Sequence, residues 1–314
     1  MITFRPVDLA SDAGHLARLY STTVPDPVSP ATIRDWWTLR KEEVRFTTLA
    51  FDQQQAVGYW DLDRETWMRP GHWYVKVIVD PAYRRQGLGG QLYQAALALA
   101  RQQPGASHLQ TQVREDCPDG MRFAQKRGFQ IERHAFTSIL DLQTFNEAAC
   151  AAILERVKAF RFFSLAEAGL TFENKRRLYE VNRASGLDNP GSSGVFEDFD
   201  SFCLNVFEAS WFRADTQILA ADGEYWVGLS AISVDNERGV SYNAFTGVLR
   251  AYRGRGLAQA LKLHTIMLAR RLGMRYIRTD NDSQNAPMLA INRKLGYQPE
   301  SGIYRLVGPL TVSD

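Results

Sequence analysis

The alternation of apolar and polar residues divides the first half of the chain into short strands and amphipathic helices. Four segments rich in β-branched and aromatic residues predict strands. They are residues 2–7, 45–51, 56–62 and 73–79. Apolar residues at helical spacing predict helices over residues 12–20, 30–41 and 87–102. A strand over residues 107–113 and a short helix that ends at Gly128 complete this series.

The second half repeats this order of elements. Its patterns predict four strands and two helices. The strands are residues 216–221, 225–232, 241–248 and 276–280, and the helices are residues 256–272 and 286–295, the latter capped by Gly296. We expect residues 142–161 to begin as a helix and to connect the halves. Residues 187–194, LDNPGSSG, have the composition of a loop.

One phrase occurs twice, at matching places in the two series. AYRRQGLG covers residues 82–89, and AYRGRGLA covers residues 251–258, 169 positions later. Two further pairs of phrases, AVGYW with WVGLS and KRGF with KLGY, occur in the same order at nearly the same offset. Two copies with so long a period indicate a duplicated domain and not a solenoid. We predict domains of residues 1–145 and 146–314.

Composition narrows the class of protein. The 314 residues suit about two domains, and 45% apolar residues suffice for two cores. A net charge of +2 offers no broad surface for nucleic acid or an anionic membrane. The cysteines (Cys117, Cys150 and Cys203) and five scattered histidines predict neither a disulfide framework nor a metal site. Because no signal segment or membrane-spanning apolar run is found, we expect a cytoplasmic protein without nucleic-acid or membrane partners.

Both copies of the repeated phrase lie between a predicted strand and a predicted helix. A glycine-rich turn there points backbone N–H groups at one spot, and the helix dipole favours an anion by roughly 0.3–2 kcal/mol. Arg84, Arg85, Arg253 and Arg255 add donors suited to phosphate. Neither copy continues as a P-loop with lysine followed by serine or threonine. A dinucleotide fingerprint is also excluded, because it would follow the first strand and would carry a third glycine.

The phrase resembles the Q/R-x-x-G-x-G/A signature of the GNAT acyltransferase superfamily, and the flanking elements follow that family's order. The resemblance covers nearly the whole chain as a tandem pair, as in mycothiol synthase-like proteins. It implies an α/β (α+β) fold of two GNAT-type domains, each a mixed, mostly antiparallel twisted sheet flanked by helices.

The resemblance also implies where acetyl-CoA binds. Each signature would hold the pyrophosphate, and the pantetheine arm would lie along the fourth strand like an added strand. The implied cofactor-binding residues are Val77, Val79, Arg84, Arg85, Gln86, Gly87, Gly89 and Gly90 in the first half, and Thr246, Val248, Arg253, Gly254, Arg255, Gly256, Ala258 and Asn285 in the second.

Such a reaction needs a neutral amine, a donor for the oxyanion and an acid for the leaving thiolate. The family often supplies the acid as a tyrosine, but the matching positions here are Ala124 and Asn292, and Cys117 stands where the second half has Asn285. Substitute acids or bases in the second half are Asp280 and Tyr242, which we favour, with Glu224 and Tyr304 as further candidates. The structural alternatives are a cap or ion pair for Asp280 and simple packing for Tyr242.

These observations predict an enzyme that moves an acetyl group from acetyl-CoA to a primary amine of a small molecule, as a monomer or homodimer. We expect catalysis mainly in the second half, where residues 279–297 match the family more fully. Because both tyrosines are absent, a non-catalytic acyl-CoA-binding or sensing module is the alternative. Aromatic residues of the first half either line an acceptor pocket or pack in the core. They are Trp36, Trp37, Trp60, Trp67, Trp73 and Tyr74.

Overall fold

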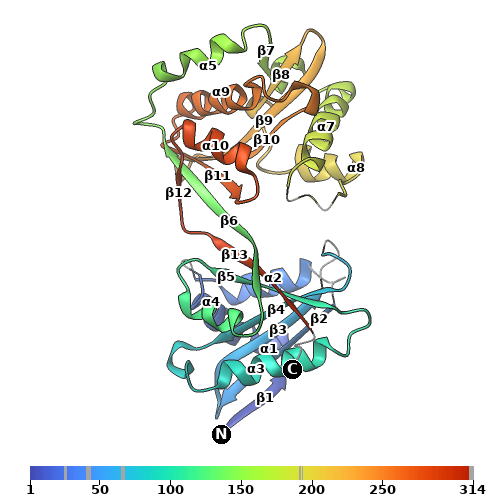
Figure 1. Ribbon diagram of the computed structural model, residues 1–314, viewed down its shortest axis with the longest axis vertical. Coiled ribbons are helices and arrows are strands. Elements are labelled where there is room, and N and C mark those ends of the chain that lie inside the picture. The colour runs from blue at the N-terminus through green and yellow to red at the C-terminus, as the bar shows by residue number, and fades with distance from the viewer. Residues whose placement is uncertain (25–26, 40–43, 65–67, 191, 193, 311–314) are drawn as a thin grey trace. The chain divides into compact units, whose positions relative to one another are not determined.

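The computed structural model divides the chain into two compact units. It describes residues 1–314 except 25–26, 40–43, 65–67, 191, 193 and 311–314. Unit 1 contains Met1–Glu132 together with Tyr304–Asp314, and unit 2 contains Arg133–Ile303. Each unit is built on one twisted sheet with helices on both faces (Figure 1).

The sheet of unit 1 has the strand order β1-β2-β3-β4-β5-β13. These strands are β1 (Ile2–Pro6), β2 (Val44–Asp52), β3 (Gln55–Arg64), β4 (His72–Val79), β5 (His108–Arg114) and β13 (Ile303–Pro309). Helices α1 (Leu9–Ser21) and α2 (Pro30–Leu39) pack with Tyr59 on one face. Helices α3 (Leu88–Ala100) and α4 (Pro118–Gln125) pack with Trp60 on the other. Neighbouring residues of β3 thus enter different cores, because side chains alternate along a strand.

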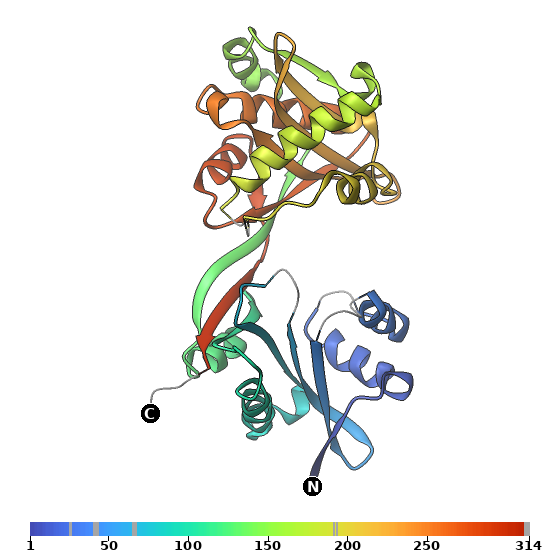
Figure 2. The same cartoon turned by 90° about the vertical axis from the view of Figure 1, so that its right-hand side faces the viewer.

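The sheet of unit 2 has the order β6-β11-β10-β9-β8-β7, and β12 also pairs with β6. The strands are β6 (Gln130–Asp141), β7 (Arg161–Ser164), β8 (Gln217–Asp222), β9 (Tyr225–Asp235), β10 (Val240–Val248), β11 (Tyr276–Asp282) and β12 (Gln298–Pro299). Helices α5 (Ala151–Arg156) and α9 (Leu257–Arg271) pack with Val227 and Ile232 in one core. Helices α7 (Phe172–Leu187) and α8 (Phe199–Phe202) pack with Leu229 in the other, and Figure 2 shows α7 lying across the sheet.

Short helical segments and one further helix complete the fold. These are η1 (Pro81–Tyr83), η2 (Ala148–Cys150), α6 (Leu165–Ala168), η3 (Cys203–Phe207), η4 (Ala214–Thr216), η5 (Arg250–Tyr252) and α10 (Ala286–Lys294). The predicted class is confirmed, because β4–β5 and β10–β11 are parallel whereas most other strand pairs are antiparallel.

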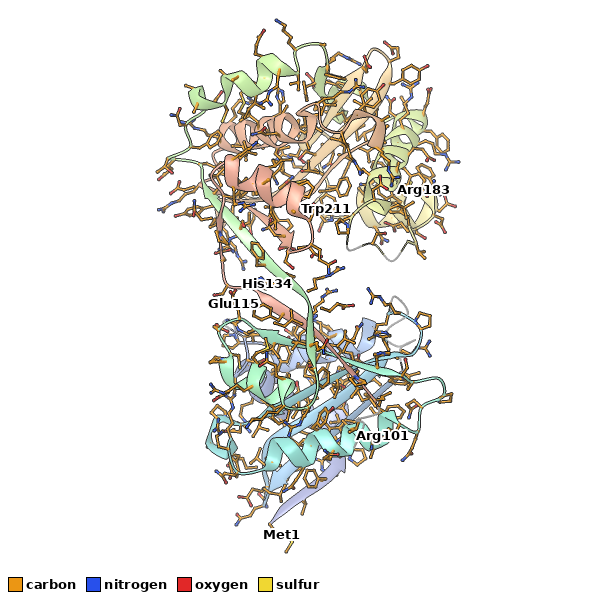
Figure 3. The ribbon with its side chains drawn as sticks, in the orientation of Figure 1. Met1, Arg101, Glu115, His134, Arg183 and Trp211 are labelled. Atoms are coloured by element: carbon orange, nitrogen blue, oxygen red, sulfur yellow. The ribbon has the colours of Figure 1, made fainter. Side chains whose placement is uncertain are left out.

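The compact units differ from the predicted halves in their last strands. Residues 135–141 of β6 pair with β11, so the strand that follows the first repeat belongs to the sheet of unit 2. Conversely, β13 lies beside β5 in unit 1, where Leu310 N donates to Ser107 O (3.1 Å). Arg101, labelled in Figure 3, donates from Nε to Leu310 O (3.1 Å). Repeated sequence marks the duplicated segments, whereas strand pairing decides the compact units.

Several elements differ from their prediction. The segment 142–161 does not begin as a helix: its helical residues are Ala148–Arg156, inside unit 2, and not between the units. Periodicity also missed β6, α7 and β13. Residues 188–190 are irregular, as the loop prediction required, although Leu187 closes α7. Gly191, Ser193 and Trp67 lie outside the described residues.

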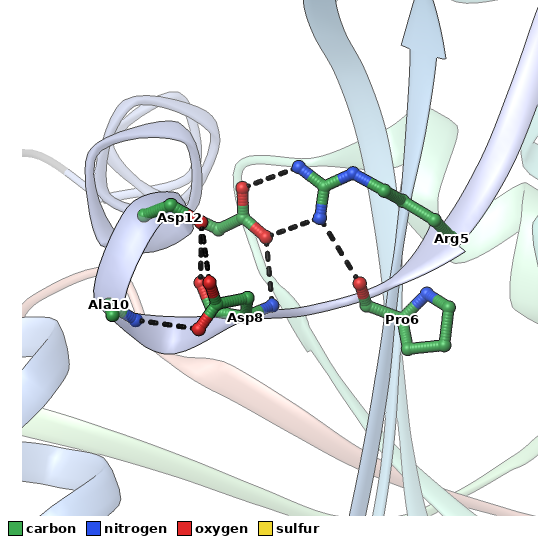
Figure 4. Close-up of polar contacts among 6 residues, drawn as sticks. Arg5, Pro6, Asp8, Ala10 and Asp12 are labelled. Atoms are coloured by element: carbon green, nitrogen blue, oxygen red, sulfur yellow. Dashed lines mark hydrogen bonds and ion pairs between the residues drawn. The ribbon is translucent and has the colours of Figure 1, made fainter.

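A buried carboxylate joins the first strand to the first helix. Asp12 is 1% exposed and accepts two hydrogen bonds from Arg5, at 2.6 and 2.7 Å, and one from Asp8 N at 2.9 Å (Figure 4). The hydrogen bonds from Arg5 hold the pKa of Asp12 below its usual value. Because the folded state favours the ionised form, this stabilisation is present above pH 3.8 and is lost as the pH falls further.

Asp12→Asn should therefore lower the free energy of unfolding of unit 1 by about 1–2 kcal/mol at pH 7, a figure reduced for the exposure of Arg5. Urea unfolding followed by tryptophan fluorescence measures this, since five of the seven tryptophans belong to unit 1. Asp116→Asn, at an exposed ion pair, is the control. Equal unfolding midpoints for the two variants would contradict the assignment.

Candidate functional site

In unit 1 the parallel strands β4 and β5 part before β4 ends. Their pairing covers His72–His108, Trp73–Leu109 and Tyr74–Gln110 and then stops. Val77 and Val79, predicted to flank the pantetheine arm, lie in the stretch of β4 that pairs with β3 but not with β5. This leaves one edge of β4 available for an extended ligand.

The same parting occurs in unit 2. Strands β10 and β11 pair from Val240–Tyr276 to Asn243–Thr279, and the last residues of β10 continue beside β9 alone. Thr246 and Val248 lie in that continuation. Here the parting coincides with a β-bulge, because Ala244 has no partner on β9. A bulge leaves its extra residue outside the regular ladder and re-aims the local backbone.

Both repeated phrases fold into the same turn at the start of a helix. Gly87 and Gly256 are the N-caps of α3 and α9, with φ of +86° and +91°. At the preceding matched positions, Arg85 and Gly254 have φ of +64° and +76°. Neither helix has a side-chain cap. Its first backbone N–H groups are therefore left for a ligand, which is the arrangement that binds phosphate.

Side chains of the phrase make matching contacts in the two turns. Arg84 Nε donates to Val79 O (2.9 Å), and Arg253 Nε donates to Val248 O (3.1 Å). Gln86 Nε2 donates to Ala82 O at 3.0 Å, and Arg255 Nη2 donates to Ala251 O at 3.4 Å. Arg84 and Arg253 thus connect each turn to the end of the preceding strand by a hydrogen bond from Nε.

Each turn has an acidic residue beside one of its arginines. Asp188, at the end of α7, accepts from Arg250 and from Arg253 Nη2, the latter at 2.8 Å. The hydrogen bond from Arg250 and the nearby charge of Arg253 hold the pKa of Asp188 below its usual value. An anionic ligand in this turn must therefore share Arg253 with a carboxylate. In the first turn, Arg85 pairs with Asp119 at 3.2 Å.

Two of the predicted cofactor residues, Gly89 and Ala258, have packing roles. A Cβ at Gly89 would lie 3.3 Å from the Phe123 ring, which is a tight contact, whereas one at Gly90 would lie at an ordinary contact distance of 3.5 Å from Arg127 Nη2. Ala258 packs against the core of unit 2. Small residues here let each helix lie close to its neighbours, and their contact with a cofactor stays a prediction.

Tyr242 and Asp280, which the sequence analysis named as separate acid or base candidates, lie on the adjacent strands β10 and β11 and are hydrogen-bonded to each other. Burial and a hydrogen bond with Asp280 raise the pKa of Tyr242 above its usual value. Asp280 also accepts from Thr137 Oγ1 (3.1 Å) on β6. A tyrosine in this setting stays protonated at neutral pH, so its proton is in place for donation, but the raised pKa makes the hydroxyl a weaker acid than that of a solvated tyrosine.

The other candidates lie elsewhere. Tyr304 belongs to unit 1, where it packs against the α3 core, so its assignment to the second half was wrong. The reason is that β13 completes the first sheet. Glu224 is exposed in the turn between β8 and β9.

Asn285 and Cys117 occupy equivalent places, as the N-caps of α10 and α4. The Oδ1 atom of Asn285 accepts from Met288 N (3.3 Å) and so already caps the helix. Asn292 is buried, and its Nδ2 donates to Asn281 Oδ1 (2.7 Å). Ala124 is buried in the core of unit 1.

Sequence reasoning missed a buried lysine beside the bulge. Lys262 of α9 is 1% exposed, donates to Asn243 Oδ1 (2.6 Å) and lies 5.0 Å from the ring centre of Tyr297. Asn243 Nδ2 in turn donates to Ser230 Oγ (3.0 Å) and Ala231 O (2.9 Å). Burial lowers the pKa of Lys262 to about 7. Its signal in the sequence is its place on the apolar face of the helix, one turn before Ile266.

Among the described residues, no group of three or more histidine, cysteine or acidic side chains has the arrangement of a metal site. None of the helices in the described ranges is long and apolar enough to cross a bilayer.

The acetyltransferase (GNAT) family pattern matches residues 14–129 and 183–297. The chain belongs to this family. Both matches contain the parted strands and the uncapped helix of one unit, so the chain contains two GNAT domains in tandem.

Individual proteins are similar to the chain over most of its length. A mycothiol acetyltransferase of Renibacterium salmoninarum is 22% identical over 237 residues, which cover 73% of this chain and 65% of the relative. The chain therefore spans less than two thirds of that relative's length. A GCN5-related N-acetyltransferase from Sphaerobacter thermophilus has a TM-score of 0.68 at 18% identity, with 100% of this chain and 97% of that chain covered. A tandem GNAT protein from the clavulanic acid biosynthesis pathway has a TM-score of 0.64 at 18% identity, and both chains are fully covered, at 100% each. At these identities the structures show a shared fold.

The buried lysine gives a test of pH dependence. The folded state holds Lys262 with a pKa of about 7, against 10.5 for a solvated lysine, so the unfolded state binds more protons between these values. Stability of unit 2 should therefore rise with pH across that window, by at most about 1.4 kcal/mol per pH unit. Lys262→Met should remove this rise, as measured by urea unfolding at pH 7 and pH 9.5. Lys158→Met, at an exposed lysine, should keep it. If the stability of both variants changed with pH in the same way, Lys262 would not have the lowered pKa that its burial implies.

Proposed function

We propose that this GNAT protein transfers the acetyl group of acetyl-CoA to a primary amine of a small molecule, and that unit 2 carries the reaction. One observation carries the proposal. Strands β10 and β11 diverge at a β-bulge, and the hydrogen-bonded pair Tyr242 and Asp280 lies beside this point. The name of the mycothiol acetyltransferase relative supports a small-molecule acceptor.

The residues of unit 2 fit acetyl-CoA at two places. The uncapped start of α9, with Gly256 and Arg253, would hold the pyrophosphate, and the free edge of β10 near Thr246 and Val248 would hold the pantetheine arm. When bound, acetyl-CoA supplies an activated acetyl group. Unit 1 has the same two features, an uncapped helix start at Gly87 and a free edge of β4, so we propose that it binds a second molecule of the cofactor.

The remaining chemistry falls to side chains and backbone around the parting. As the amine nitrogen bonds to the acetyl carbon and the C–S bond breaks, Tyr242 would donate its proton to the leaving sulfur, and the proton that the amine loses would pass through Asp280 back to Tyr242. Asp280 orients the Tyr242 hydroxyl and attracts the acceptor amine by its charge. The backbone at Ala244, outside the ladder, offers a hydrogen-bond donor to the acetyl oxygen.

A substitution in the second turn tests the cofactor site. Gly256→Glu should abolish acetyl-CoA binding to unit 2, because it places a carboxylate in an anion site. Calorimetry should then show one cofactor per chain where the unchanged protein binds two. Gly256→Ala is the control, since it has the same strain at positive φ without the charge, and its Cβ would meet only Val157 at 3.6 Å.

The matched variant Gly87→Glu assigns activity to a unit. It should remove the other cofactor and leave turnover with an amine panel intact, as followed by thiol release. Loss of turnover with Gly87→Glu alone would transfer the reaction to unit 1. Cofactor binding without turnover for any amine would favour the sensing module.

The acid is tested by Tyr242→Phe. We expect kcat to fall about 100-fold with acetyl-CoA affinity unchanged, because the hydroxyl serves the chemical step and not the phosphates. Tyr276→Phe, on the neighbouring strand β11, is the matched control. An unchanged kcat for Tyr242→Phe would remove the tyrosine from the mechanism.

A further inference from the structure

Unit 1 contains a cavity of about 150 Å³ on the face of its sheet opposite α3. Helices α1 and α2 form one side and strands β2, β3 and β4 the other. The lining residues include Tyr20, Trp36, Arg45, Thr47, Asp61 and Lys76. The volume suits a ligand of about six to eight non-hydrogen atoms, since a cavity of this size holds benzene.

The strand side of the cavity carries opposite charges next to each other. Thr47, Asp61 and Lys76 form one row across the three strands, because each is the direct register partner of the next. Asp61 is 7% exposed, and its Oδ1 accepts from Thr47 Oγ1 (2.6 Å), which fixes the orientation of the carboxylate. Directly opposed side chains lie close on one sheet face, so the side chains of Asp61 and Lys76 leave the sheet next to each other.

A second row of charges supports the first. Arg45 and Asp63 are also register partners, with Arg45 Nη2 3.2 Å from Asp63 Oδ2. The Nε of Arg45 lies 3.6 Å from Asp61 Oδ1. Burial and the neighbouring Asp61 raise the pKa of Asp63 to about 6. Among the described residues, Asp63 Oδ1 and Arg45 Nε have no hydrogen-bond partner. Apolar residues would fill this site at a lower energetic cost, so the charges point to recognition and not to packing.

The helix side of the cavity supplies aromatic surface. Tyr20 of α1 and Trp36 of α2 meet edge to face, with ring centres 5.4 Å apart. Protein cations already lie over two rings: Lys76 Nζ is 5.2 Å from the Tyr20 ring, and Arg45 Cζ is 5.3 Å from the Trp37 ring. A ligand that is only a cation would meet these two positive groups, whereas one that is only an anion would meet Asp61.

We propose that this cavity binds a small α-amino acid with an apolar side chain. Its carboxylate would face Lys76, its ammonium group would face Asp61, and its side chain would contact Tyr20 and Trp36. One carbon of such a molecule carries both charges, which matches the adjacent charges of the Thr47–Asp61–Lys76 row. This binding is a property of unit 1 and does not depend on which unit transfers acetyl groups.

The test is calorimetry on the full chain without acetyl-CoA. The probes are L-valine, its decarboxylated form isobutylamine and its deaminated form isovalerate, with glycine and L-alanine to vary size. L-Valine should bind at least tenfold more tightly than the two forms that lack one charge. No binding of any of the three amino acids at 10 mM, on the order of the weakest affinity of interest, or equal binding of all three valine-sized probes, would overturn the proposal.

Two substitutions locate the binding. Asp61→Asn should weaken L-valine and isobutylamine binding at least tenfold, whereas Lys76→Met should weaken L-valine and isovalerate binding. Asp235→Asn, at an exposed acid of unit 2, controls for net charge and should change neither. Thermal unfolding by circular dichroism identifies a variant that fails to fold. If one of the two variants does not fold, binding to the other one tests the site. Unchanged L-valine binding in the folded variants would overturn the site.

The cofactor variants separate this proposal from the transfer reaction. Gly256→Glu should bind L-valine as the unchanged protein does. Failure of acetyl transfer would then leave the amino-acid site standing, and failure of L-valine binding would leave the transfer proposal standing.

Discussion

The separation of two parallel strands governs the architecture of both units. The β4–β5 pair holds for three residues and the β10–β11 pair for four before the strands diverge. Backbone groups beyond the divergence have lost a ladder partner, and buried backbone groups need one. The turn that follows each diverging strand leads into a helix whose first N–H groups are also uncapped. An extended ligand with an anionic end would satisfy both sets of groups, and the proposed cofactor, acetyl-CoA, has this shape.

The duplicated units have kept this arrangement while their surroundings have diverged. The arginine that ties each turn to its strand is the same in both, at Arg84 and Arg253. Unit 2 adds a bulge, a buried lysine and the carboxylate of Asp188, whereas unit 1 adds a charged cavity on the far face of its sheet. The two units therefore share backbone geometry at the turn and the diverging strands, and differ in the side chains around them.

The sequence could predict those features that depend on local chemistry. Gly87 and Gly256 indicate positions of positive φ, and runs of β-branched residues indicate most of the strands. The turns and the order of the elements could therefore be predicted. The pairing of the strands could not be predicted, because an alternating pattern does not indicate which strand lies beside which. Tyr304 was assigned to the wrong unit for this reason. Asp61 and Asp63 share a face by simple alternation, yet their alignment with Lys76 and Arg45 required the register.

The exchange of last strands has a consequence for how the protein is made. During synthesis β5 leaves the ribosome long before its neighbour β13. One edge of β5 is therefore without its partner strand while unit 2 is translated. An open edge invites pairing with another chain, including β13 of a second copy. The duplication is thus no longer modular: a truncated chain of residues 1–132 lacks the strand that closes its own sheet, and folding of the first unit is tied to translation of the last.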